Sequence, residues 1–179
     1  MKKSNKPPKF ISLFLIYGIL YIFIEVLWRA ISPPNGDVGM MALREFFGLK
    51  SLVGYTSVWM FIAGAFSGIG LGAIQENKWV KHKISSFWQS VIGAGLILVI
   101  EFISGCIFNI WLGMGIWDYS TLPFNICGQI CLLFGILWFF LTPFAFWVDE
   151  LIDFYLFESV KSITPLFQRY KSCLMFWKK

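Results

Sequence analysis

Two glutamates stand inside segments that are otherwise apolar. Glu25 lies in the run 10–28, and Glu101 lies in the run 87–112. An acidic residue at the depth of a membrane helix costs roughly 2.5 to 3.5 kcal/mol on insertion scales, so it faces the bundle interior and finds a partner or a proton. The two carboxyl groups are therefore the first candidates for a site that holds a cation, a proton or a polar substrate headgroup.

Further polar residues follow each glutamate at helical spacing. Arg29 lies four residues after Glu25, where it can form an ion pair on the same helix face. Gly105 and Asn109 follow Glu101 in steps of four, and the glycine leaves space beside the carboxyl group. Because the two helices run in the same direction, the two carboxylates can occupy one layer near the outer leaflet.

The segment 113–123 and the residues after it add polar groups at the same depth. Trp117 suits the membrane interface, and Asp118 can accept hydrogen bonds from loop amides or from Arg29. Asn125 and Gln129, placed at the start of the next predicted helix, can supply amides. The sequence thus predicts a buried polar layer, which is either a structural network that holds the helices in register or a binding site reached from the outer face.

The elements that position these residues are membrane helices. The chain has 179 residues, of which 58% are hydrophobic and only 14% are charged, whereas a soluble domain has about a quarter charged residues. A helix of about 20 apolar residues can cross the hydrocarbon core, and the segments 10–28, 52–74, 87–112 and 124–146 fit this length. Ser120 or Thr121 is expected to cap the fourth helix, with Pro123 in its first turn. We predict an all-α polytopic membrane protein with four transmembrane helices and a C-terminal amphipathic interfacial helix.

Lysine and arginine residues are unevenly distributed outside these segments. Four precede the first, three lie between the second and third, and five follow the fourth, whereas the loop 113–123 has none. The positive-inside rule places both termini in the cytoplasm, and we expect the plasma membrane. The predicted regions are a basic cytoplasmic N-terminus (1–9), a four-helix membrane domain (10–146) and an amphipathic cytoplasmic tail (147–179). The net charge of +5 favours membrane lipid as a partner and not nucleic acid.

The predicted tail combines acidic and apolar residues at helical spacing. Asp149, Glu150, Asp153 and Glu158 lie among apolar residues at the spacing of an amphipathic helix, and Pro165 interrupts this helix. Such a segment lies on a membrane surface or docks a cytoplasmic partner. Cys173, close to the membrane, is a candidate for acylation.

Small residues recur on one face of the second predicted span. Gly64, Gly68 and Gly72 are four residues apart, a spacing that lets helix backbones approach closely. Gly105 offers a similar close approach in the third span. We favour packing within the chain over packing between two copies, and a homo-oligomer stays open.

Several catalytic signatures are missing from the sequence. His82 is the only histidine, and neither GxxxxGK[ST] nor GxSxG occurs. The four cysteines lack the spacing of a metal site or a disulfide framework. We therefore expect no enzyme activity, cofactor or metal in this chain, and any energy source has to be separate.

Three motifs together resemble those of a known family: "EFISG" (101–105), "WDYS" (117–120) and "PFNICGQICL" (123–132). They are similar to the small CmpB-like bacterial membrane proteins catalogued as type IV ABC-transporter permeases. The resemblance covers 18–147 and implies a multi-pass plasma-membrane protein involved in transport. Many bacterial members carry Asn-Arg-Gly and Pro-x-x-Pro-x-Tyr-Gly after the first helix, whereas this loop reads "RAISPPNGDVGMMALREFFGLK".

Three function classes follow from these observations. The first is a permease subunit of a transport complex, with an acidic polar site near the outer leaflet and a separate cytoplasmic ATPase. The second is a lipid-interacting scaffold or regulator in which the glutamates are structural. The third is an outer-leaflet lipid-modifying enzyme that uses Glu101 and Asp118 as acid and base, which we rank last because no activated nucleophile accompanies them.

Overall fold

The computed structural model describes residues 8–31, 56–158 and 162–175, and these residues are mostly helical. The helices are α1 (Lys9–Ile31), α3 (Trp59–Glu76), α4 (Lys78–Lys83), α5 (Ser86–Gly105), α6 (Leu132–Ile152) and α7 (Leu166–Leu174). Two π-helical turns, η1 (Cys106–Trp111) and η2 (Asp153–Phe157), continue α5 and α6. A two-residue antiparallel hairpin, β1 (Asn125–Ile126) and β2 (Ile130–Cys131), precedes α6.

Three helical segments in the described part are long and apolar enough to cross a membrane. They are Lys9–Ala30, Ser86–Trp111 and Leu132–Phe157. The first and third predicted spans are confirmed in their extent. The second, expected over 52–74, begins at Trp59 and ends at Glu76; residues 52–55 lie outside the described residues, and this 18-residue helix is not among the three.

The fourth predicted span was wrong at both ends. It was expected over 124–146 with a cap at Ser120 or Thr121, but residues 125–131 form the hairpin and α6 starts at Leu132. Phe124, Cys127 and Gly128 have positive φ angles of 54°, 52° and 68°, which an α-helix cannot contain. Helical structure then continues to Phe157, about three turns beyond the predicted end.

Close packing of α1 on α3 depends on the glycines of α3. The two helices are antiparallel, because Tyr21 lies over Gly64 and Tyr17 lies over Gly68. A Cβ atom at either glycine would overlap the tyrosine ring. The predicted glycine face therefore packs within the chain, as small residues allow in membrane helices.

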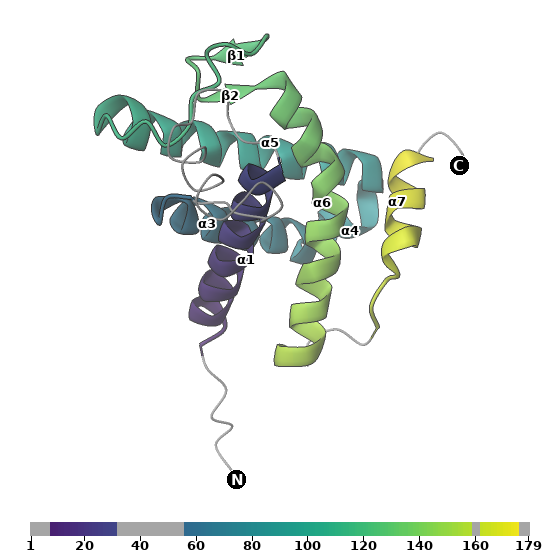
Figure 1. The fold of residues 1–179 in the computed structure, drawn as a ribbon. Coiled ribbons are helices and arrows are strands. Elements are labelled where there is room, and N and C mark those ends of the chain that lie inside the picture. Colours follow the sequence, from purple (N-terminus) through teal and green to yellow (C-terminus); the bar gives the residue numbers. More distant parts are fainter. Residues whose placement is uncertain (1–7, 32–55, 159–161, 176–179) are drawn as a thin grey trace.

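A second helix pair completes the bundle. Gly93 of α5 faces Thr142 of α6, and Gly135 of α6 faces Leu98 of α5, so these helices are also antiparallel. Leu71, Ile97 and Phe146 form the buried apolar core between α3, α5 and α6. Figure 1 shows the hairpin at one end of α6 and the start of α1 toward the opposite end; we call these the hairpin end (residues 112–131) and the Lys9 end.

Candidate functional site

Local hydrogen bonds shape the segment at the hairpin end. The Asn125 side chain donates to the carbonyl oxygens of Ser120 and Leu122 and accepts from the Gly128 amide at 3.1 Å. Asp118 accepts from the backbone amide and the hydroxyl of Ser120 at 2.8 and 3.0 Å. These bonds hold the positive-φ turn without help from a helix, and they explain why Asn125 is not the start of α6.

Gln129 links this segment to η1 and to the end of α5. Asn109 donates to Oε1 of Gln129 at 2.8 Å and accepts from the Ile116 amide at 2.7 Å. The Trp117 indole donates to the backbone carbonyl of Gln129 at 3.0 Å. Gly105 leaves the space that the Gln129 side chain fills. Asn109, Trp117 and Gln129, predicted from different segments, therefore meet in one network.

Glu101 lies beneath this network with 6% of its surface exposed. Tyr119 donates to its Oε1 at 3.1 Å, and the Trp138 indole donates to its Oε2 at 3.0 Å. Each carboxyl oxygen thus has one neutral donor. Within residues 8–31, 56–158 and 162–175, no lysine or arginine forms an ion pair with Glu101.

Glu25 and Arg29 form the predicted ion pair, with 3.1 Å between Nε and Oε1. Arg29 also donates to the carbonyl oxygen of Ile116 at 2.9 Å, which ties α1 to the hairpin end. The carboxyl groups of Glu25 and Glu101 interact electrostatically with one another. The two glutamates therefore occupy one region of the bundle, as the sequence predicted.

Tyr119 lies in the loop outside the membrane-spanning segments, and the pKa of its hydroxyl reflects the burial and the charges around it. Burial raises the pKa of its hydroxyl well above the ordinary value near 10, and the nearby Glu101, Tyr21 and Glu25 raise it further. A neutral phenol donates its proton to an ionised carboxyl group in a hydrogen bond, and it can accept one from a protonated carboxyl group. The arrangement can therefore hold a proton or a small cation on Glu101, or it can serve as a structural network.

A second acidic cluster lies at the Lys9 end, in the segment whose pattern predicted an amphipathic helix. Of its four acids only Glu158 is exposed, whereas Asp149, Glu150 and Asp153 each have only 5% of their surface exposed. Tyr17 donates a short hydrogen bond to Asp149. Lys9 forms ion pairs with Asp153 at 3.0 Å and with Glu76 at 2.5 Å. The acids are buried because helical structure continues past residue 146, so Asp149 and Asp153 face α1 and α3.

Glu150 fastens α7 to the bundle. Its carboxylate pairs with Arg169 and accepts from the Thr164 amide at 2.9 Å. Tyr170 of α7 donates to the carbonyl oxygen of Phe140 at 2.7 Å. The tail thus returns along α6, which the amphipathic pattern did not predict, because the partners of Glu150 lie 14 and 19 residues later, on either side of Pro165.

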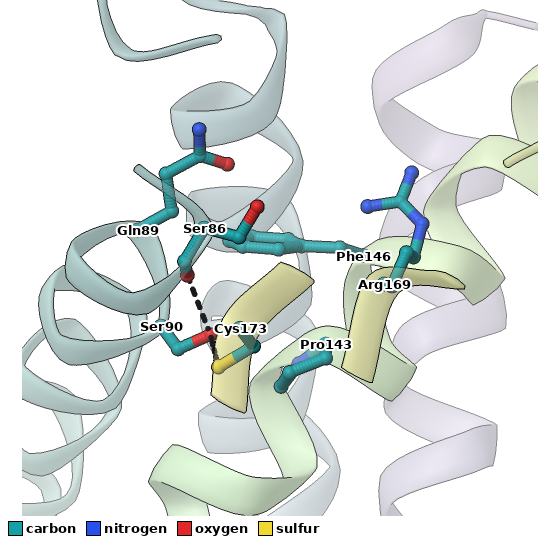
Figure 2. Close-up of a pocket in the computed structure, with 7 residues that line it drawn as sticks. All are labelled: Ser86, Gln89, Ser90, Pro143, Phe146, Arg169 and Cys173. Carbon is teal, nitrogen blue, oxygen red and sulfur yellow. Dashed lines mark hydrogen bonds between the residues drawn. The ribbon is translucent and has the colours of Figure 1, made fainter. Parts of the chain in front are cut away.

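Cys173 is enclosed where α7 meets α5 and α6 (Figure 2). Its side chain is 1% exposed, and its Sγ lies 3.4 Å from Oγ of Ser90. A cavity of about 30 Å³ adjoins it, lined by Ser86, Gln89, Ser90, Pro143, Phe146 and Arg169 as well as the cysteine itself. An acyl chain cannot be attached to a thiol in this position, so the predicted acylation site was wrong.

The described residues contain no group of three or more His, Cys, Asp and Glu side chains that could hold a metal ion. The cysteines are all free, and they come from separate places: Cys106 in η1, Cys127 and Cys131 at the hairpin, and Cys173 in α7. Glu101 is the side chain that the geometry favours for holding a proton or a small cation, either alone or together with its hydrogen-bond partner Tyr119.

Comparison with known proteins assigns the chain to a family. The sequence profile of the family described as "Putative ABC-transporter type IV" matches residues 11–177. No curated protein and no solved structure matches the chain significantly. The match extends from the first turn of α1 to the end of α7. The apolar helices fit insertion into a membrane. The chain therefore belongs to the family described as "Putative ABC-transporter type IV".

Proposed function

We propose that the chain is a permease subunit of a transport complex, with a polar site centred on Glu101. The observation that carries the proposal is a carboxyl group that is buried, bonded only by the neutral donors Tyr119 and Trp138, and not paired with a cation in the described residues. A buried acid that serves only as a structural anchor is usually paired with a charge. An acid kept without one can take up a proton or a cation.

Residues around Glu101 supply a route from the hairpin end. Asn109, Trp117 and Gln129 bond to one another directly above the carboxyl group, and Asp118 and Asn125 hold the loop that carries them. The Glu25–Arg29 pair adds a charged wall from α1. Opening this polar layer would expose Glu101 to the side of the membrane that the hairpin faces, which we infer to be the outer side.

The packing of α3 supports a fourth membrane span. α3 lies against α1 from the Tyr21–Gly64 contact to the Lys9–Glu76 ion pair. Its 18 residues extend about 27 Å, close to the roughly 30 Å of hydrocarbon. Four spans place both termini on one side, and the basic residues at the Lys9 end support a cytoplasmic location in the plasma membrane.

Energy for transport would come from a separate cytoplasmic ATPase, because the sequence has no phosphate-binding loop. The Lys9 end offers a surface for this partner or for the membrane interface. Trp79 of α4, Trp88 of α5 and Phe167 of α7 are exposed, and α4 and α7 also carry the exposed basic residues Lys81, Lys83 and Lys171. We propose no enzymatic activity for the chain itself.

Mass spectrometry of proteins that co-purify with the gently solubilised chain tests the proposal. We expect an ATPase in stoichiometric amount. Glu101→Gln should leave this complex intact but reduce its transport-coupled ATP hydrolysis about tenfold or more, the size of effect expected when one charge-stabilising group is lost. Glu158→Gln, at an exposed position, is the matched control.

Two results would contradict the proposal. If no nucleotide-binding protein co-purifies under any mild condition, a transport complex is excluded. If Glu101→Gln abolishes folding and assembly together, the carboxyl group is structural and the polar layer is a packing network. Light scattering of the purified complex also tells whether one copy or two are present.

A further inference from the structure

An apolar groove opens between α1 and α6. Its volume is about 280 Å³, near the lower end of the range of about 300 to 1,000 Å³ for small-molecule sites. Leu20, Phe23 and Ile24 of α1 form one rim, and Leu141 of α6 forms part of the other. These four side chains are exposed, and both helices are long and apolar enough to span a membrane, so an occupant can enter from the lipid.

One polar atom in the wall of this groove is left for an occupant. Four side chains with polar atoms line the groove: Tyr17, Tyr21, Ser67 and Trp138. Three of them already donate hydrogen bonds to acceptors inside the protein. The hydroxyl of Tyr21, in contrast, has no hydrogen-bond partner in the part of the chain that the structure describes. An unpaired polar atom in an otherwise apolar wall indicates where the polar group of a ligand lies.

The charges near Tyr21 are mainly negative. Glu101 and Glu25 both lie within electrostatic range of its hydroxyl, together with the base Arg29. Arg29 is paired with Glu25 at 3.1 Å, whereas the described donors to Glu101 are both neutral. The charge that is left to attract a ligand at this end of the groove is therefore that of the Glu101 carboxyl group.

The opposite end of the groove carries acids as well. Three of them lie within electrostatic range of the Tyr17 hydroxyl, which lines this end: Asp149, Asp153 and Glu76. Lys9 pairs with Asp153 and Glu76, so this lysine is already engaged. Carboxyl groups thus lie behind both ends of the groove, which favours a positively charged occupant over a negatively charged one.

The apolar part of the groove extends away from Tyr21 along α6. Tyr21 stacks on Trp138 with 6.1 Å between ring centroids, which places both rings at one end. The lining of α6 continues from Trp138 to Val148, about 15 Å at 1.5 Å per residue. A ligand whose charge lies at Tyr21 can therefore place a hydrocarbon chain or ring along the rest of the groove.

We infer that the groove between α1 and α6 binds a hydrophobic amine in its protonated form, with the ammonium group at the Tyr21 hydroxyl and the apolar body directed toward Val148. The hydroxyl oxygen accepts a hydrogen bond from the ammonium group, and the nearby Glu101 supplies the opposite charge. A neutral alcohol could satisfy the hydroxyl but not the carboxylate. This inference rests on the proposed function, because it names the substrate class for the Glu101 site.

Photolabelling of the full chain tests the substrate class. The chain is reconstituted in dioleoyl-phosphatidylcholine vesicles with decylamine that carries a diazirine on its alkyl chain, and the alcohol with the same chain and diazirine is the neutral match. After irradiation, peptide mass spectrometry locates the labelled residues. Leu133, exposed on α6 outside the groove, reports the concentration of each probe in the bilayer. Relative to Leu133, we expect the amine to label the groove about tenfold more than the alcohol does.

Two variants test the residues that recognise the amine. Tyr21→Phe removes the hydroxyl and keeps the ring that stacks on Trp138, so the fold should be retained while amine labelling of the groove falls about tenfold. Glu101→Gln should lower the labelling to a similar extent. Tyr155→Phe, at an exposed position outside the groove, is the matched control and should label like the unmodified chain.

The inference is overturned if the alcohol labels the groove as strongly as the amine, or if Tyr21→Phe labels like the unmodified chain. Labelling confined to lipid-facing positions such as Leu133 overturns it too. If Glu101→Gln fails to fold, Tyr21→Phe alone decides the outcome.

This experiment also separates the substrate class from the transport complex, because labelling needs no partner protein. A groove that takes no amine in a chain that still co-purifies with an ATPase overturns the substrate class alone. Amine labelling in the groove without a co-purifying ATPase supports the binding site and contradicts the transport complex.

Discussion

The hydroxyl of Tyr119 donates a 3.1 Å hydrogen bond to Oε1 of Glu101. This bond joins the loop at the hairpin end to the last turns of α5, 18 residues earlier in the chain. Tyr119 also stacks on Phe134 of α6, with 4.5 Å between ring centroids. One side chain thus positions the candidate acid and holds the loop against two helices.

Replacing Tyr119 with phenylalanine removes this donor and keeps the ring. Oε1 of Glu101 is then left buried without a hydrogen bond, so we expect the free energy of unfolding to fall by about 1 to 3 kcal/mol. Reversible unfolding in mixed detergent micelles measures the change. Tyr155→Phe, at a position that is 71% exposed, is the control and should be neutral; equal stability of the two variants would mean that the bond contributes nothing.

The raised pKa of Tyr119 makes stability depend on alkaline pH. In the unfolded chain the hydroxyl titrates near 10, whereas in the folded protein its pKa lies higher. The contribution is therefore complete below pH 10 and declines above it, because the unfolded state then loses the proton first. We expect the stability difference between the unmodified protein and Tyr119→Phe to shrink by up to about 1.4 kcal/mol per pH unit above 10. A difference that stays constant up to pH 11 would show that the phenol is not buried against the acids.

Gly68 and Gly95 provide a matched test of helix packing. A Cβ atom at Gly68 would overlap the Tyr17 ring, whereas one at Gly95 would meet nothing within 4 Å. Gly68→Ala should lower the free energy of unfolding by about 1 to 3 kcal/mol through overpacking. Gly95→Ala should raise it by up to about 1 kcal/mol, since alanine is the better helix former. The same unfolding assay compares them, and equal effects would argue against the α1–α3 contact.

Arg169 holds α7 in place through Glu150. Arg169→Met removes the ion pair and leaves a buried carboxylate, a loss that costs about 3 to 5 kcal/mol at buried sites. We expect α7 to detach and the thiol of Cys173 to become accessible. Maleimide labelling followed by peptide mass spectrometry should detect modified Cys173 in this variant and very little in the unmodified protein.

Lys171→Met is the control for this experiment, because Lys171 is exposed on the same helix. Cys127, which is exposed in the folded protein, reports that the reagent reaches every sample. Rapid labelling of Cys173 in the unmodified protein would contradict the enclosed position of the thiol.

Local patterns in the sequence were enough to predict the membrane environment, the apolar helices and part of the polar layer. These properties depend on local patterns: long apolar runs become helices because backbone groups in lipid must bond within the segment. Glu25 and Arg29 pair as predicted because four residues make one helical turn. Glycines four residues apart lie on one face of a helix and let another helix pack closely. In α3, α1 packs against Gly64 and Gly68 of this face.

Long-range contacts set the start of the last long helix and the burial of the acids, and neither could be read from a local pattern. The run 124–146 is apolar throughout, yet hydrogen bonds from Asn125 and positive φ angles at Phe124 and Cys127 turn its first residues into a hairpin. Asp149 and Asp153 resemble a solvated face until Tyr17 and Lys9, more than a hundred residues earlier, pack against them. A pattern in one segment describes that segment, whereas the burial of a charge depends on partners that the fold brings from elsewhere.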